Sequence, residues 1–151
     1  MRRKDREMPK EFGLKLIDRC EYGVAAMIDE DGRPYTAALN LVRVGEKLYF
    51  HCAMEGKKTD SLRKNPEVCI SFVGGVSPVP DKFTTLYESA VVRGKAAEVT
   101  EDEEKIHALR VLCEKLTPSN MDNFDEAIKR SLHRTAVWRI DIEDISAKAK
   151  R

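Results

Sequence analysis

The sequence lacks the short motifs that mark the common phosphate, hydrolase and metal sites. It contains no Walker loop, no G-x-G-x-x-G turn and no G-x-S-x-G elbow. Its four cysteines (Cys20, Cys52, Cys69 and Cys113) include no Cys-x-x-Cys pair and show no metal-ligand spacing. This distribution favours reduced thiols in a cytoplasmic protein over a disulfide framework, and we predict no metal site.

The sequence also lacks an excess of either charge and any long hydrophobic run. Its 27 Lys and Arg nearly balance its 26 Asp and Glu, which leaves a formal net charge of +1. Nucleic-acid binding normally requires a basic excess, so we expect no nucleic-acid partner. No stretch approaches the roughly 20 apolar residues of a membrane helix, and no signal-peptide core follows the basic start of the chain. We therefore expect a cytoplasmic protein with no membrane partner.

What is present describes one ordinary globular domain. The chain has 151 residues, of which 42% are hydrophobic and 35% are charged. This length fits a single domain over residues 1–151 and is short for two. There is no internal repeat, linker or low-complexity segment.

The hydrophobic pattern predicts about six strands with short helices between them. Helical spacing, prolines and caps predict helices over residues 9–20, 57–65 and 100–116, and more weakly over 121–132. Apolar runs and alternation between turn residues predict strands over 24–28, 34–44, 48–53, 68–73, 84–99 and 135–142. Because strands and helices do not alternate as βαβ units, we predict an α+β barrel rather than a doubly wound sheet.

Three local features refine this prediction. Thr100 and Glu103 have the spacing of a capping box for the helix that follows. Gly94 lies inside a strand pattern, which indicates a bulge or bend in a closing barrel. Residues 76–81 contain two prolines and are expected to form a mobile or partner-contacting loop.

The first candidate for chemistry is Gly56-Lys57-Lys58, at a predicted strand-to-helix junction. A helix N-terminus already carries about half a positive charge, so two lysines there are electrostatically misplaced. A phosphate would reverse this balance, because it accepts hydrogen bonds from free backbone N–H groups and pairs with both lysines. The alternative, which a lysine pair cannot exclude, is that both side chains are merely solvated.

The second candidate is His51, in an otherwise apolar strand. Imidazole titrates near neutral pH, which suits proton donation to a nitro or carbonyl group during reduction. The alternative is a structural histidine packed in the core. Cys52 follows directly, and alternation predicts that it faces the opposite side of the strand, which argues against a Cys–His nucleophile pair. We interpret His107 and His133 as surface residues and Trp138 as a core or interface aromatic.

Taken in order, several segments resemble the pyridoxamine 5′-phosphate oxidase-like split barrels, and among them the Nim-type 5-nitroimidazole resistance proteins. The match spans almost the whole chain. The segments that carry it are Met1–Lys4, Tyr22–Val24, Pro34–Ala38, Tyr49–Ala53, Gly56–Lys58, Asn65–Val68, Phe83–Thr85, Tyr87–Ala96 and Arg139–Ile142.

The resemblance implies a split β-barrel that forms a homodimer with two FMN sites at its interface. It implies that the strand matching Thr36, Ala37, Ala38, Leu39 and Asn40 lies along the flavin ring, with backbone hydrogen bonds to its polar edge. His51 and Cys52 match positions near the ribityl chain and phosphate. Lys57 and Lys58 match the phosphate ligands, and Ser89 matches a position close to the flavin. His51 also matches the functional histidine of the Nim-type group, and residues 83–85 match a segment that reaches across the dimer.

The resemblance to the oxidases proper is weaker. They carry an Arg-x-His near the C-terminus, where this chain reads Ile140-Asp141-Ile142. At a position where they offer a lysine, this chain has Val42. These departures argue against oxidation of vitamin B6.

The function predicted from the sequence is an FMN-dependent oxidoreductase that reduces small molecules such as nitroimidazoles and related nitro compounds. NADH or NADPH is the expected electron donor, and His51 is the expected catalytic residue. Two alternatives remain open. One is a flavin-binding protein without catalytic activity, and the other is a haem-binding or haem-handling barrel with His51 as axial ligand.

Overall fold

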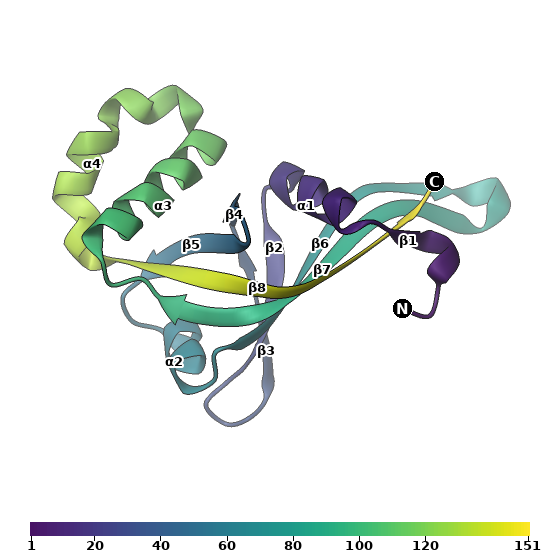
Figure 1. The fold of residues 1–151 in the computed structure, drawn as a ribbon, viewed down its shortest axis with the longest axis horizontal. Helices are drawn as coiled ribbons and strands as arrows, with labels where there is room; N and C mark the ends of the chain where they lie inside the picture. The colour runs from purple at the N-terminus through teal and green to yellow at the C-terminus, as the bar shows by residue number, and fades with distance from the viewer.

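The computed structural model describes residues 1–151 as one antiparallel sheet with four α-helices (Figure 1). The strands are β1 (Glu7–Met8), β2 (Gly23–Ile28), β3 (Pro34–Leu39), β4 (Val42–Val44), β5 (Lys47–Ala53), β6 (Glu67–Val79), β7 (Thr84–Glu98) and β8 (Thr135–Lys150). The helices are α1 (Lys10–Arg19), α2 (Lys57–Lys64), α3 (Asp102–Leu116) and α4 (Phe124–Ser131), with short 3₁₀ turns at Lys4–Arg6, Pro80–Lys82, Pro118–Asn123 and Leu132–Arg134.

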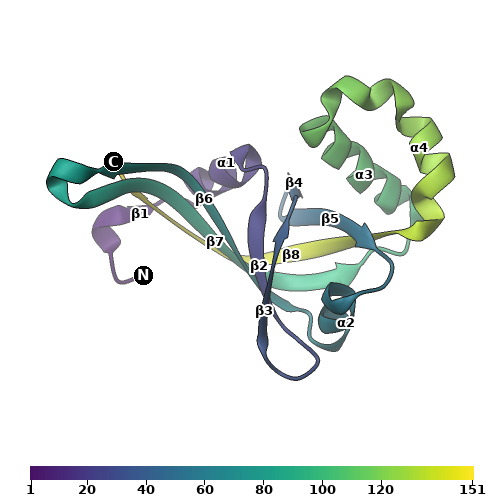
Figure 2. The ribbon, with the colours of Figure 1, turned by 180° about the vertical axis from the view of Figure 1, so that it is seen from behind.

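The sheet curls into a barrel that does not close. Its strand order is β3-β2-β6-β7-β8-β5-β4, with β1 added beside β8, so β3 and β4 are edges that do not pair with each other. The long strands β6, β7 and β8 run from the barrel into a projecting arm beside α1 (Figures 1 and 2). Helices α3 and α4 lie at the opposite end of the molecule, beyond β5. This architecture confirms the predicted α+β split barrel.

Two apolar clusters form the core. The larger one fills the barrel and contains Phe50, Phe72 and Trp138, each at most 2% exposed. The smaller one lies between the sheet and α3, where Tyr49 and Val137 pack against residues of that helix. Because successive strand residues point to opposite faces, β5 and β8 contribute to both clusters.

The strand count differs from the prediction, and the difference has a local cause. The segment 34–44 breaks at Asn40-Leu41 into β3 and β4, and Glu7–Met8 adds the short β1, which makes eight strands. The expected loop at 76–81 is instead mostly strand, because β6 continues to Val79 opposite β7. Pro78 is tolerated in β6 because it lies beyond the part of the strand that pairs with β2, so no ladder hydrogen bond is lost on that side. Pro80 begins the 3₁₀ turn that follows.

The predicted capping box is wrong. Helix α3 begins at Asp102 with Glu101 as its N-cap, and no side chain caps it. Its first turn carries three acids that complement the helix dipole. One of them, Glu104, accepts hydrogen bonds of 2.9 Å from both the Tyr49 hydroxyl and the Arg139 guanidinium, so it attaches α3 to the sheet.

Lys115, near the end of α3, fixes this helix to the rest of the fold. Its ammonium donates to the carbonyl oxygens of Cys20 at 2.7 Å and Leu41 at 2.9 Å. These contacts join α3 to the end of α1 and to the break between β3 and β4. No helix of the structure has the length and apolar character needed to cross a membrane.

Candidate functional site

The corner between β5 and α2 is built around Gly56. This residue is the N-cap of α2 and has φ 146°, a conformation that L side chains rarely adopt. Arg63, in the last turn of α2, donates to the carbonyl oxygen of Met54 at 3.2 Å and pairs with Glu98 on β7. Sequence reasoning missed Arg63, because an arginine on a polar helix face gives no signal of its role.

Lys57 faces the turn between β2 and β3. Its ammonium lies 3.3 Å from a carboxylate oxygen of Asp29 and 4.8 Å from the ring centroid of Tyr35. Asp29 is only 7% exposed, and its other oxygen accepts hydrogen bonds from the backbone N–H groups of Asp31 and Arg33. The Arg33 N–H, and then Lys57, hold the pKa of Asp29 below its ordinary value. Lys57 is therefore already neutralised by a carboxylate.

Lys58 has a different environment. Its ammonium lies 5.6 Å from the ring centroid of Phe50, and no carboxylate lies within 4 Å of it. Its charge lowers the pKa of His51 and opposes the rise that burial causes in the pKa of the Cys52 thiol. Lys58 is thus a cation without a counter-ion in the first turn of α2, whereas the sequence alone does not distinguish the two lysines.

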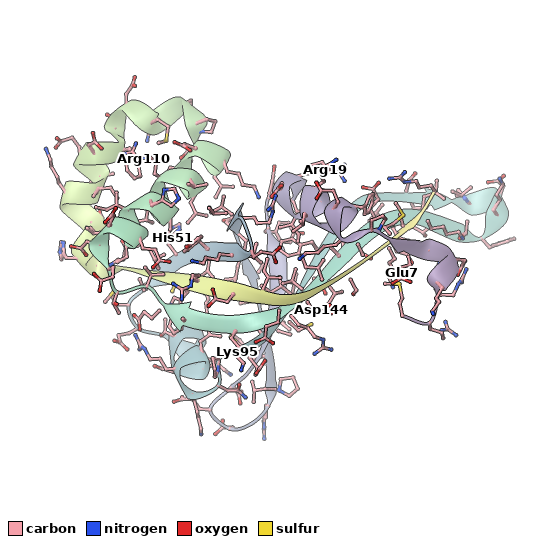
Figure 3. The ribbon with its side chains drawn as sticks, in the orientation of Figure 1. Glu7, Arg19, His51, Lys95, Arg110 and Asp144 are labelled. Carbon is pink, nitrogen blue, oxygen red and sulfur yellow. The ribbon has the colours of Figure 1, made fainter.

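His51 and Cys52 lie on opposite faces of β5, as predicted. Cys52 packs against the barrel core, whereas His51 points to the side covered by α3 and α4 (Figure 3). Partial burial lowers the pKa of the His51 imidazole below 6.5, and the Lys58 ammonium lowers it further. At neutral pH the ring is therefore mostly uncharged. His107 and His133 are exposed, and Trp138 lies in the barrel core, as expected.

The strand expected along a flavin ring is the edge strand β3. It pairs with β2 on one side only, so its other side offers backbone N–H and C=O groups that no strand satisfies. The side chains of Thr36, Ala38 and Asn40 are exposed on one face, whereas Ala37 and Leu39 turn toward the core. The Asn40 amide donates to the carbonyl oxygen of Glu21 at 2.8 Å.

Ser89 on β7 carries a buried hydroxyl oxygen with no hydrogen-bond partner. It lies opposite Val73 of β6, and the register from β6 through β2 to β3 places it on the same sheet face as Ala38. The structure therefore brings Ser89 and the exposed residues of β3 onto one face. Pairings between strands far apart in the chain create this arrangement.

The same sheet face carries exposed apolar side chains. Val24 is 41% exposed and Ile28 is 36% exposed, both on β2, and Val73 on β6 is 57% exposed. Tyr22, just before β2, is 57% exposed. Large apolar side chains gathered on one face of a folded protein are typical of an interaction surface.

A protein-family model described as pyridoxamine 5′-phosphate oxidase matches residues 11–149. The chain belongs to this family. The match confirms the resemblance drawn from the sequence segments, and it covers the whole sheet apart from β1 and the last residue of β8. No curated protein matches the chain.

Solved structures of the same fold include a protein from Bacteroides thetaiotaomicron whose assignment as a 5-nitroimidazole antibiotic resistance protein is itself provisional. It is 25% identical, with a TM-score of 0.81, and the match covers 95% of this chain and 86% of that one. This similarity supports the resemblance to the Nim-type group.

Two further structures share the fold at lower identity. An FAD-binding protein from Mesorhizobium loti is 21% identical over 97% of this chain and 98% of that one, with a TM-score of 0.73. A flavocytochrome from Azotobacter vinelandii is 18% identical over 95% of this chain and 68% of that one, with a TM-score of 0.80. At these identities the similarity shows the fold alone.

Proposed function

We propose that this protein is an FMN-binding homodimeric oxidoreductase that reduces small molecules such as nitroimidazoles and related nitro compounds. The observation that carries the proposal is the buried Ser89 hydroxyl without a partner, on the face that the edge strand β3 borders. A buried polar group without a partner destabilises the fold by about 1–3 kcal/mol, and a ligand with polar edges would satisfy it.

The residues present suit the parts of FMN. The unpaired backbone of β3 at Thr36–Asn40 offers donors and acceptors for the polar edge of the ring. Lys58 offers a free positive charge for the phosphate beside the N-terminal N–H groups of α2. Lys57 is the second phosphate ligand, once it leaves Asp29, and Cys52 is the neighbour expected near the ribityl chain.

When bound, FMN supplies the electron transfer, with NADH or NADPH as the proposed donor. The protein orients the acceptor, excludes water and provides the proton. His51 is the proposed proton donor, since its lowered pKa makes its protonated form a stronger acid than ordinary imidazolium.

The proposed homodimer rests on the apolar sheet face. A second copy that covers Val24, Ile28 and Val73 would remove these side chains from water and enclose Ser89 and the β3 edge. Phe83, which is 98% exposed near the tip of the arm, is available for contact with that copy.

The test of this function combines identification of the cofactor with an activity assay. The purified protein is expected to be yellow and to release FMN on heating. With NADH or NADPH it is expected to reduce 2-methyl-5-nitroimidazole in steady-state turnover. A protein that binds FMN without turnover would be the non-catalytic alternative, and a colourless protein that ignores added FMN would contradict the proposal.

Replacing His51 by alanine is expected to lower kcat about 100-fold or more, because general-acid catalysis contributes at that scale. The wild-type kcat is expected to rise as the pH falls toward the His51 pKa, which lies below 6.5, because the imidazolium fraction grows in that direction. The His51→Ala variant should lose this pH dependence while it keeps most of its FMN.

The matched control is His107→Ala, since His107 is an exposed histidine on α3. It should leave both kcat and its pH dependence unchanged. Unchanged turnover in His51→Ala would remove the catalytic role of His51.

A further inference from the structure

A cavity of about 230 Å³ lies between α3, α4 and the adjoining ends of β5 and β8. Its walls are mainly apolar side chains of the two helices and of the 3₁₀ turn after α4, among them Leu109, Leu112, Phe124, Ile128 and Leu132. No Lys, Arg, Asp or Glu lines it. Of the residues that line this cavity, the function proposed above uses only His51.

The polar groups of the cavity are nearly all committed to the protein. The hydroxyl of Thr117 donates to the carbonyl oxygen of Cys113 at 3.2 Å, and that of Thr135 donates to the carbonyl oxygen of Ser131 at 2.8 Å. The Ser131 hydroxyl accepts from Arg134 at 3.3 Å. The ring of His51, in contrast, makes no hydrogen bond to any residue, and it lies on the strand below the α3–α4 pair (Figure 3).

We propose that this cavity is a second ligand site, which binds a small uncharged aromatic molecule through a single hydrogen bond to His51. The volume lies below the usual 300–1,000 Å³ of drug-sized pockets, so the occupant has about ten non-hydrogen atoms. FMN and haem are both larger than this. The cavity shares His51 with the proposed reaction but contains no residue of the β3 edge and not Ser89, and ligand binding to it does not require flavin.

The absence of charged residues from the lining favours an uncharged ligand. A carboxylate or ammonium placed among these apolar walls would lose hydration, and no residue of the lining carries an opposite charge. The Lys58 ammonium acts on His51 but is not part of the lining. His51 is mostly uncharged at neutral pH, so it does not supply that charge, but it can donate or accept one hydrogen bond. A flat neutral ring fills the cavity and satisfies the imidazole.

Indole is a suitable probe, because it is a neutral ring compound of about nine non-hydrogen atoms with one N–H donor. We expect it to bind with a Kd of about 1 mM or tighter, as fits a ligand of this size. Titration at pH 7.5 should shift the NMR methyl signals of Leu109, Leu112 and Ile128 and the ring signals of His51. Benzoate, of similar size but charged, should leave these signals in place.

Two variants localise the binding. Ala127 lines the cavity on α4, and Ala127→Phe fills it, so indole binding should be lost while the FMN content stays that of the wild type. His51→Ala removes the hydrogen-bond partner and should weaken indole binding about 5- to 10-fold. Circular dichroism checks that both variants are folded.

Several results would overturn the proposal. One is an indole titration of the wild type that shifts other signals and not those of the cavity. Another is equal binding of benzoate and indole, or retention of indole binding by a folded Ala127→Phe variant. A third is a shift of the cavity signals when the protein is diluted without ligand. Such a shift would mean that a second copy of the chain fills the cavity in the undiluted protein and leaves it on dilution. Because the NMR assay needs no flavin, its outcome is independent of whether the protein binds FMN.

Discussion

Replacing Gly94 by alanine is expected to destabilise the protein by about 3 kcal/mol or more, a large part of the 5–15 kcal/mol typical of a domain. A Cβ at this position would lie 2.3 Å from the carbonyl oxygen of Asp141 and 3.1 Å from its carbonyl carbon. The obstacle is backbone of the neighbouring strand, which cannot rotate away as a side chain can. Strands β7 and β8 would have to separate at the centre of the barrel.

Urea denaturation of the wild type and of Gly94→Ala measures this difference. The control is Gly32→Ala, at a turn where φ is 77° and no atom lies within 4 Å of the added methyl group. That change adds only backbone strain and is expected to destabilise by about 1 kcal/mol. If Gly94→Ala were as stable as Gly32→Ala, the close contact between β7 and β8 would not be a fixed feature of the fold.

Gly94 also shows what an isolated residue in a sequence can predict. A glycine inside a strand pattern indicates a bulge or a close approach of backbones, and the structure contains both. The register of β7 against β8 shifts between Arg93 and Gly94, next to the contact with Asp141. The local pattern alone therefore located the bend, although it could not identify β8 as the partner.

Other elements were predictable because their signals are local. Pro9 and the helical spacing after it predict α1, and Pro66 marks the end of α2. The far half of β6 was not predictable, because Gly74, Gly75 and Pro78 are untypical of a strand and only the pairing with β7 creates one there. The capping box failed because Glu104 and its neighbours stabilise the start of α3 without a hydroxyl cap.

The candidate site also has features that a local pattern predicts and features that depend on strand pairing. Alternation along β5 was enough to place His51 and Cys52 on opposite faces. Alternation could not predict that Ser89 and Ala38 share a face, because this depends on the register of three strand pairs. Only the family resemblance suggested that these residues belong to one site. Likewise, nothing near Lys57 in the sequence reveals that Asp29 neutralises it.

Replacing Lys58 by alanine is expected to weaken FMN binding about 100-fold. A charge-assisted hydrogen bond contributes about 1.5–3 kcal/mol, and Lys58 has no competing carboxylate within 4 Å. Fluorescence titration of the flavin-free protein measures the affinity. Riboflavin, which lacks the phosphate, is the matched control ligand: its affinity should be nearly the same for the wild type and for Lys58→Ala. Loss of riboflavin binding as well would mean that the change damages the barrel rather than the phosphate site.

Asp29→Asn is expected to have the opposite effect, with FMN binding about 3- to 10-fold tighter. The amide oxygen can still accept from the N–H groups of Asp31 and Arg33, so the turn is retained. The substitution removes the negative charge that now holds Lys57 at 3.3 Å and frees this lysine for the phosphate.

The double variant in which both Lys57 and Lys58 are replaced by alanine should bind FMN least. If Asp29→Asn left FMN affinity unchanged while Lys58→Ala reduced it, the phosphate would be held by Lys58 without Lys57. If neither single change affected it, the phosphate would not bind at this corner.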